Sequence, residues 1–158
     1  MASLLAHPTA ATGVRGTTRA TAGMLEMDYD VTPLSVRIAR VIVSAHLRLW
    51  GMEKLVDTGA LVVSELLTNV LNHTRPDRDG RRSALITVTR TPDGVALCVH
   101  DEDPSLPQRR CAGDEDEDGR GLQLVSVIAD QFGVSRTPSG GKDVWLTLLS
   151  PGEPKATP

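Results

Sequence analysis

Aromatic side chains are scarce in this sequence, since its 158 residues include two Trp, one Tyr and one Phe. Its core must therefore consist mainly of Leu, Val, Ile and Ala. A basic block is also missing, because 17 Lys and Arg stand against 20 Asp and Glu and the net charge is −3. Nucleic-acid surfaces rely on clustered cations and on aromatic rings that stack on bases. We therefore expect no direct nucleic-acid binding.

Cysteine is equally scarce. Cys98 lies in an apolar, strand-like run and Cys111 in a polar one, so a disulfide framework is not expected and a reducing compartment fits. The four histidines show no paired spacing with cysteines that would suit zinc. No apolar run reaches the roughly 18–20 residues that span a bilayer. The N-terminus also lacks the basic and apolar regions of a secretion signal. These features predict a cytoplasmic protein without membrane association.

The chain has the length of one domain with a sizeable core. Residues 1–22 are rich in Ala, Thr and Gly without periodicity, which predicts a disordered N-terminal tail. Residues 23–150 are predicted to form a single domain, and residues 151–158 a loose C-terminal tail.

Apolar periodicity and turn residues predict the order of elements within that domain. We expect a strand over 24–29, a helix from Pro33 to Trp50 capped by Thr32 and stopped by Gly51, and a helix over 53–74 ended by Pro76. Strands over 84–90 and 95–101 follow, then a helix from about 122 to Phe132 closed by Gly133, and strands over 134–137 and 144–149. This order predicts an α+β fold, a two-layer α/β sandwich whose mixed, mostly antiparallel sheet has helices on one face.

The helix over 53–74 carries two stripes. Its apolar stripe, a core face, consists of Val62, Val63, Leu66, Leu67, Val70 and Leu71. Beside it, Glu65, Asn69 and His73 stack at positions i, i+4 and i+8. An acid, a carboxamide and an imidazole in one row suit a general base, an oxygen ligand and a hydrogen-bonding ring. The alternative is an ordinary amphipathic helix, with His73 as a satisfied residue at the margin of the core.

Asp101 continues an apolar row of the strand over 95–101, because side chains alternate and Val95, Leu97 and Val99 point the same way. An unpaired buried charge is costly. We therefore expect Asp101 to have a specific partner.

Three other motifs resemble ligand-binding sites. The acidic run at 114–118 resembles the start of a calcium loop, but Val125 stands where the bidentate glutamate belongs, so calcium is excluded. A solvent-exposed acidic loop or a lid remains open for this run. Gly119 and Gly121 open a helix, where exposed amides favour phosphate. Gly141 and Lys142 do not form a phosphate-binding loop, because Asp143 and a strand follow; they belong to a turn.

The order of four motifs over residues 24–149 resembles the GHKL (histidine-kinase-like) ATP-binding domain, or Bergerat fold. The motifs are Glu65 with Asn69, Asp101 at a strand end, the glycine pair that opens a helix, and the turn before the strand at Val144 and Trp145. The closest resemblance is to the anti-sigma-factor serine/threonine protein kinases of actinobacterial type.

The resemblance implies ATP and Mg²⁺ as cofactors. Glu65 would be the catalytic general base, Asn69 would ligate Mg²⁺, and Asp101 would accept the adenine amino group under a lid formed by residues 102–118. The residues expected to bind the nucleotide are Asn69, His73, Asp101, Gly119, Arg120, Gly121 and Leu122. The partners that the resemblance implies are a STAS-domain anti-anti-sigma factor, a sigma factor and a second copy of the chain.

The chain departs from the family pattern at two positions. Asp103 stands where the usual Asp-x-Gly-x-Gly motif has a glycine, and Asp143 stands where a Thr is frequent. Three functions therefore stay open: a protein kinase, a nucleotide-gated switch that binds a regulator without useful catalysis, and an α/β scaffold that has lost nucleotide.

Overall fold

In a computed structural model, residues 5–8, 13–106 and 120–152 are described, the first four of them by their backbone alone. Within these residues, seven strands form one sheet in the order β1-β2-β3-β4-β5-β7-β6, and every neighbouring pair is antiparallel. The strands are β1 (Leu5–Pro8), β2 (Gly16–Ala20), β3 (Met24–Asp30), β4 (Ser83–Thr91), β5 (Gly94–Asp101), β6 (Gln131–Arg136) and β7 (Lys142–Leu149).

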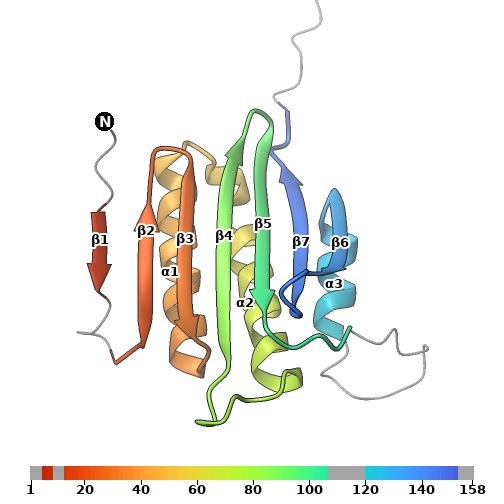
Figure 1. The fold of residues 1–158 in the computed structure, drawn as a ribbon. Coiled ribbons are helices and arrows are strands. Elements are labelled where there is room, and N and C mark those ends of the chain that lie inside the picture. The colour runs from red at the N-terminus through yellow and green to blue at the C-terminus, as the bar shows by residue number, and fades with distance from the viewer. Residues whose placement is uncertain (1–4, 9–12, 107–119, 153–158) are drawn as a thin grey trace, which may run out of the picture.

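The helices are α1 (Pro33–Leu49), the short 3-10 helix η2 (Glu53–Leu55), α2 (Val56–His73) and α3 (Arg120–Ile128). Figure 1 shows α1 and α2 side by side behind the sheet, with α3 behind its β6 edge. The predicted α+β fold with two layers is therefore confirmed. The sheet was expected to be mixed and mostly antiparallel, but its described pairs are all antiparallel.

The ends of α1 follow the predicted local rules. The Thr32 hydroxyl accepts a hydrogen bond from the Ser35 amide at 3.1 Å, and the Ser35 hydroxyl accepts one from the Thr32 amide at 2.8 Å. This reciprocal capping box satisfies two amides that the helix itself leaves unpaired. Pro33 occupies the first helical position, and Gly51 follows the helix with φ +72°, a conformation that glycine adopts without strain.

The core lies between the helices and the sheet. The predicted apolar stripe of α2 faces it, since Val62, Val63, Leu66, Leu67 and Val70 are at most 2% exposed. The facing row of β5 is buried as well, and this row ends at Asp101, which is 3% exposed. Burial of these side chains removes apolar surface from water and holds α2 against the centre of the sheet.

The prediction of a disordered tail over residues 1–22 is wrong for two segments. Leu5–Pro8 form β1 and pair with β2, and Gly16–Ala20 form β2 and pair with β3. Gly16 allows the two chains to approach closely, because a Cβ atom there would lie 2.1 Å from the Asp28 carbonyl oxygen. Most side chains of β2 are exposed. The strand therefore lacks the apolar alternation that would have revealed it in the sequence. Residues 1–4 and 9–12 lie outside the described residues.

The helix predicted to reach Phe132 ends earlier. α3 stops at Ile128, and Phe132 and Gly133 belong to β6. Asp130 explains the change, because its amide donates to the Thr147 carbonyl at 2.9 Å and its carboxylate accepts from the Leu149 amide at 2.7 Å. Both bonds join the chain to the edge of β7, so strand pairing replaces the last predicted helical turn.

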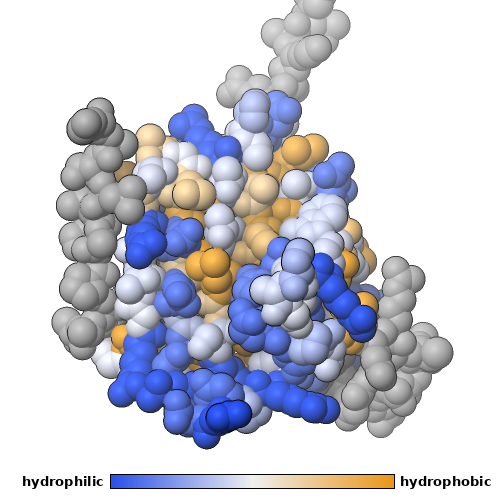
Figure 2. All heavy atoms as spheres, viewed as in Figure 1, coloured by the Kyte–Doolittle hydropathy of each residue, from blue (hydrophilic) through white to orange (hydrophobic). Residues whose placement is uncertain are grey.

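The opposite face of the sheet carries no helix among the described residues. Figure 2 shows this face, with hydrophobic residues near its centre and hydrophilic ones toward the end at which β5 finishes. Its most exposed apolar side chains include Met24, Trp145 and Leu149. Within the described part of the chain, no helix has the length and apolar character needed to cross a membrane.

Candidate functional site

The polar edge of α2 lies beside its buried stripe. Glu65 and Asn69 are half-buried, and His73 is exposed near the end of the helix. The alternative that His73 belongs to the core is therefore wrong. Successive members of the row are separated by one helical turn, about 6 Å between Cβ atoms. Within residues 13–106 and 120–152, the side chains of Glu65 and Asn69 make no hydrogen bond or ion pair. Two polar groups are thus held side by side without a partner from that part of the chain.

The start of α3 lies directly against this edge. A Cβ atom on Gly121 would lie 2.4 Å from Glu65 Oε2, so only glycine fits there without displacing the carboxylate. Arg120, the first residue of the helix, is exposed, and Leu122 is half-buried against the core. Gly119 lies outside the described residues. The structure thereby brings together a carboxylate and the amino-terminal turn of a helix, whose free amides favour anions.

Asp101 has the specific partner that its burial requires. Lys142, the first residue of β7, is opposite it in the sheet register, and its Nζ lies 3.0 Å from Asp101 Oδ1. The same Nζ donates to the Asp103 carbonyl oxygen at 3.0 Å, and the Asp103 amide donates to Asp101 Oδ1 at 2.9 Å. The side chains of Lys142 and Asp101 are 4% and 3% exposed. The carboxylate is therefore neutralised by a buried ammonium group.

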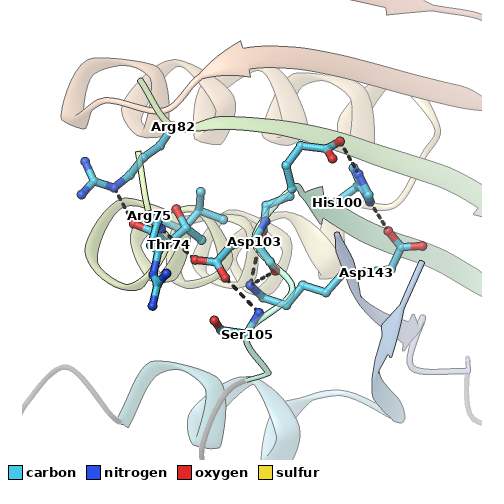
Figure 3. A network of polar contacts seen from close by, with 11 residues as sticks. Thr74, Arg75, Arg82, His100, Asp103, Ser105 and Asp143 are labelled. Carbon is cyan, nitrogen blue, oxygen red and sulfur yellow. Dashed lines mark hydrogen bonds and ion pairs between the residues drawn. The ribbon is translucent and has the colours of Figure 1, made fainter. Parts of the chain in front are cut away.

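Asp103 fixes the segment that follows β5. Its two carboxylate oxygens accept hydrogen bonds from the amides of Ser105 and Arg75, at 2.9 and 2.8 Å. Burial alone would raise the pKa of Asp103, but the amides of Ser105 and Arg75 and the charge of Lys142 outweigh it and lower the pKa to about 2. Figure 3 shows how these bonds join the end of β5 to the segment after α2. Asp103 therefore has a structural role that the sequence did not suggest.

His100 connects the same segment to β7 on the helix-free face. Its Nδ1 lies 2.7 Å from Asp143 Oδ1, and its Nε2 lies 3.0 Å from Glu102 Oε1 (Figure 3). Burial lowers the pKa of His100, but the carboxylates of Glu102 and Asp143 outweigh that effect, so the pKa is raised above 6.5. Asp143, which stands where the family frequently has a Thr, thus pairs with a histidine.

The predicted site residues fall into two groups. Glu65, Asn69 and Gly121 lie where α2 meets α3, whereas Asp101 lies in the ion-pair network at the end of β5. Lys142 was not among the predicted site residues, although the sequence carries a signal for it. Lys142 precedes Val144 by two positions, so alternation places it on the buried face of β7. No predicted site residue lines the hollow of about 450 Å³ formed by residues 51–54, 92–93 and 150–152.

Among the described residues, no cluster of three or more His, Cys, Asp or Glu side chains could hold a metal ion by itself. A Mg²⁺ ion that is carried by a nucleotide is typically held by one or two protein oxygens together with phosphates and water, and the half-buried Asn69 carboxamide offers one such oxygen. Gly121 allows the start of α3 to lie close to Glu65, and this arrangement fits a phosphate group bound at the start of the helix. At the end of β5, Asp101 is the acceptor expected for adenine, and its Oδ1 already accepts a hydrogen bond from Lys142.

Comparison with known proteins agrees with this arrangement. No curated protein matches the chain. The histidine kinase-like ATPase domain family matches residues 30–148, which span the sequence from the end of β3 to β7 and include α2, Asp101 and the start of α3. The chain therefore belongs to the histidine kinase-like ATPase domain family.

Proposed function

We propose that this protein is a Mg²⁺-ATP-dependent serine/threonine protein kinase of the anti-sigma-factor type. Its substrate would be a STAS-domain anti-anti-sigma factor, and phosphorylation of that partner would control how much sigma factor is sequestered. One observation carries the proposal: Glu65 and Asn69 stand side by side on α2 without a described partner, and Gly121 brings the start of α3 against Glu65. Family membership supports an ATP-binding regulatory role.

The proposed reaction uses this chain's groups as follows. A serine or threonine hydroxyl oxygen of the partner attacks the γ-phosphorus, the bond from that phosphorus to the β,γ-bridging oxygen breaks, and ADP leaves. The Glu65 carboxylate takes the hydroxyl proton. Asn69 would hold Mg²⁺, which neutralises phosphate charge when it is bound. The amides at the start of α3, with Arg120, would stabilise the transferred phosphoryl group, because phosphoryl transfer depends on positioning and on charge neutralisation.

The test is transfer of radiolabelled γ-phosphate from ATP to purified STAS-domain partners, with the Glu65→Gln variant as the matched control. The native protein should label a serine or threonine of one partner, and E65Q should bind ATP but transfer at least about 100-fold more slowly, the usual contribution of a general base. Equal transfer by both proteins would remove Glu65 from the mechanism. Mg²⁺-dependent ATP binding without transfer to any partner would exclude the kinase.

A nucleotide-gated binding switch is the second candidate, and the Lys142 network favours it. With Asp101 neutralised by a buried ammonium, tight nucleotide binding requires a rearrangement that a partner protein is suited to trigger. This function predicts that capture of a sigma factor survives Glu65→Gln and depends on ATP. Partner capture that is unchanged by ATP would instead favour a scaffold without nucleotide.

A homodimer is supported by the outer surface of α1. Leu34, Val41 and Leu49 are 43%, 69% and 78% exposed, and together with Ile38 and Ala45 they form one apolar stripe at helical spacing. We expect sedimentation to show a dimer that Val41→Glu converts to a monomer. A monomeric native protein would exclude this interface. Cytoplasmic location and the absence of membrane and nucleic-acid partners stay predictions.

A further inference from the structure

Lys142 holds an unusual position for a lysine. It begins β7 on the row that continues with Val144 and Leu146, so alternation directs its side chain toward the helices and not toward water. Lysine side chains are almost never fully buried unless they are paired. The register of β5 with β7 supplies the pair, because Asp101 is directly opposite.

The ammonium group is bound from two sides. It donates to Asp101 Oδ1 and to the Asp103 carbonyl oxygen, both at 3.0 Å. Asp101 Oδ1 also accepts a hydrogen bond from the Asp103 amide at 2.9 Å, so one carboxylate oxygen already has two N–H donors. A further donor that approaches this oxygen meets an acceptor that is engaged and neutralised.

The ion pair contributes little net free energy to the stability of the fold. Removing two charges from water costs about as much as their attraction returns, and apolar replacements of buried pairs are often neutral or stabilising. Lysine has a flexible stem and a strongly hydrated head, so its ammonium group can leave such a site for water more readily than a guanidinium that binds with two donors. These properties suit a replaceable contact.

We propose that Lys142 is an internal competitor for the base of the nucleotide: its ammonium group engages Oδ1 of the Asp101 carboxylate, an oxygen that would otherwise accept the exocyclic amino group of adenine. This inference rests on the proposed function and on the role of adenine acceptor that the family resemblance implies for Asp101. Nucleotide binds fully only in the fraction of molecules in which Lys142 has moved away, and the apparent affinity is reduced by that fraction. Because the ammonium also offers a donor to a base carbonyl, Lys142 weakens discrimination between adenine and a base that carries a carbonyl group there.

Calorimetric titration of Mg²⁺-ATP and Mg²⁺-ITP, whose base has a carbonyl in place of the amino group, tests this in the native protein and in Lys142→Met. We expect K142M to bind ATP about tenfold tighter or more, and the ratio of ATP to ITP affinity to rise by a similar factor. Ordinary electrostatics predicts the opposite sign, since removing a cation weakens the binding of a polyanion. Lys54→Met, at the other end of the sheet, removes the same charge and should change neither affinity.

Two further variants guard against misfolding. Lys142→Met leaves the buried Asp101 carboxylate without its cation, a change that can prevent folding. Lys142→Gln keeps an amide group as a donor. It should raise the ATP affinity and the ratio of ATP to ITP affinity, as Lys142→Met does, but by less. The double variant Asp101→Asn with Lys142→Met replaces the ion pair by neutral groups, should fold, and should bind ATP and ITP without preference.

The outcomes separate the competitor from the function. If the native protein binds ATP but K142M and K142Q bind it no tighter, the competitor is excluded and the proposed function stands. If the affinities for ATP and ITP rise equally, the substitution does not act through the base, and the proposal is also overturned. If the native protein and every folded variant bind no nucleotide, the proposed function itself fails. Binding that appears only in the Lys142 variants supports the competitor and favours the switch over the kinase.

Discussion

Replacing Gly121 with alanine tests whether α3 sets the position of Glu65. The added Cβ would lie 2.4 Å from Glu65 Oε2, whereas ordinary van der Waals contact begins at 3.4 Å, so the carboxylate must move by the difference, about 1 Å. The displaced atom ends a flexible side chain, so the fold should accept the change. Alanine also favours the helix over glycine by up to about 1 kcal/mol.

We therefore expect Gly121→Ala to be as stable as the native protein or slightly more stable, and to transfer phosphate about 100-fold more slowly. A misplacement of 1 Å in a catalytic group has an effect of that order. The assay is single-turnover transfer to the STAS-domain partner, with the free energy of unfolding measured by denaturant titration.

A double-mutant cycle with Glu65→Gln decides the mechanism. If Gly121→Ala acts through the Glu65 carboxylate, the double variant should transfer phosphate no more slowly than E65Q alone. The side chain at position 65 no longer acts as a base in E65Q, so moving it has no further effect. An additional 100-fold loss in the E65Q background would refute the reasoning and place the role of Gly121 at the phosphates.

Three other predictions concern the fold around the site. Asp103→Asn should lower the free energy of unfolding at pH 7 by about 1–3 kcal/mol, because one of two amide donors then faces an NH₂ group. Since the pKa of Asp103 is lowered to about 2, this difference in the free energy of unfolding from the native protein should shrink in denaturant titrations as pH falls from 3.8 toward 2. His100 has a raised pKa, so its charged form should stabilise the fold fully below pH 6.5 and lose this effect as pH rises through the folded-state pKa; His100→Gln should remove that slope, and an unchanged slope would assign it to other groups. Gly133→Ala should lower the free energy of unfolding by about 1–3 kcal/mol and change the fluorescence of Trp145, because the new Cβ would lie 2.3 Å from a carbon of the indole ring. An unchanged fluorescence spectrum would contradict the close contact between Gly133 and Trp145.

Local rules allowed much of the fold to be predicted. The capped start of α1, the glycine after it, the two stripes of α2 and the strands β4 and β5 depend on neighbours in sequence, and the structure confirms them. The partner expected for Asp101 was confirmed too, although its identity depends on the register between β5 and β7.

Contacts set by tertiary structure could not be predicted in the same way. Strand β2 is a mostly exposed strand that depends on pairing with β3, and the early end of α3 depends on bonds from Asp130 to β7. The approach of Gly121 to Glu65 requires the relative placement of two helices that are distant in sequence. Such placement follows from packing, and a periodic pattern does not contain it.

The pairing of β3 with β4 has a consequence for how the chain folds. Asp30 and Ser83 are opposite in the register and 53 positions apart, whereas β2 with β3, β4 with β5 and β6 with β7 are local hairpins. Joining β3 to β4 requires closure of a long segment, an entropic cost that slows folding. The helical pair α1 and α2 shortens that segment when it forms. The helix that carries the polar edge is therefore also one of the two helices that shorten this long closure of the sheet.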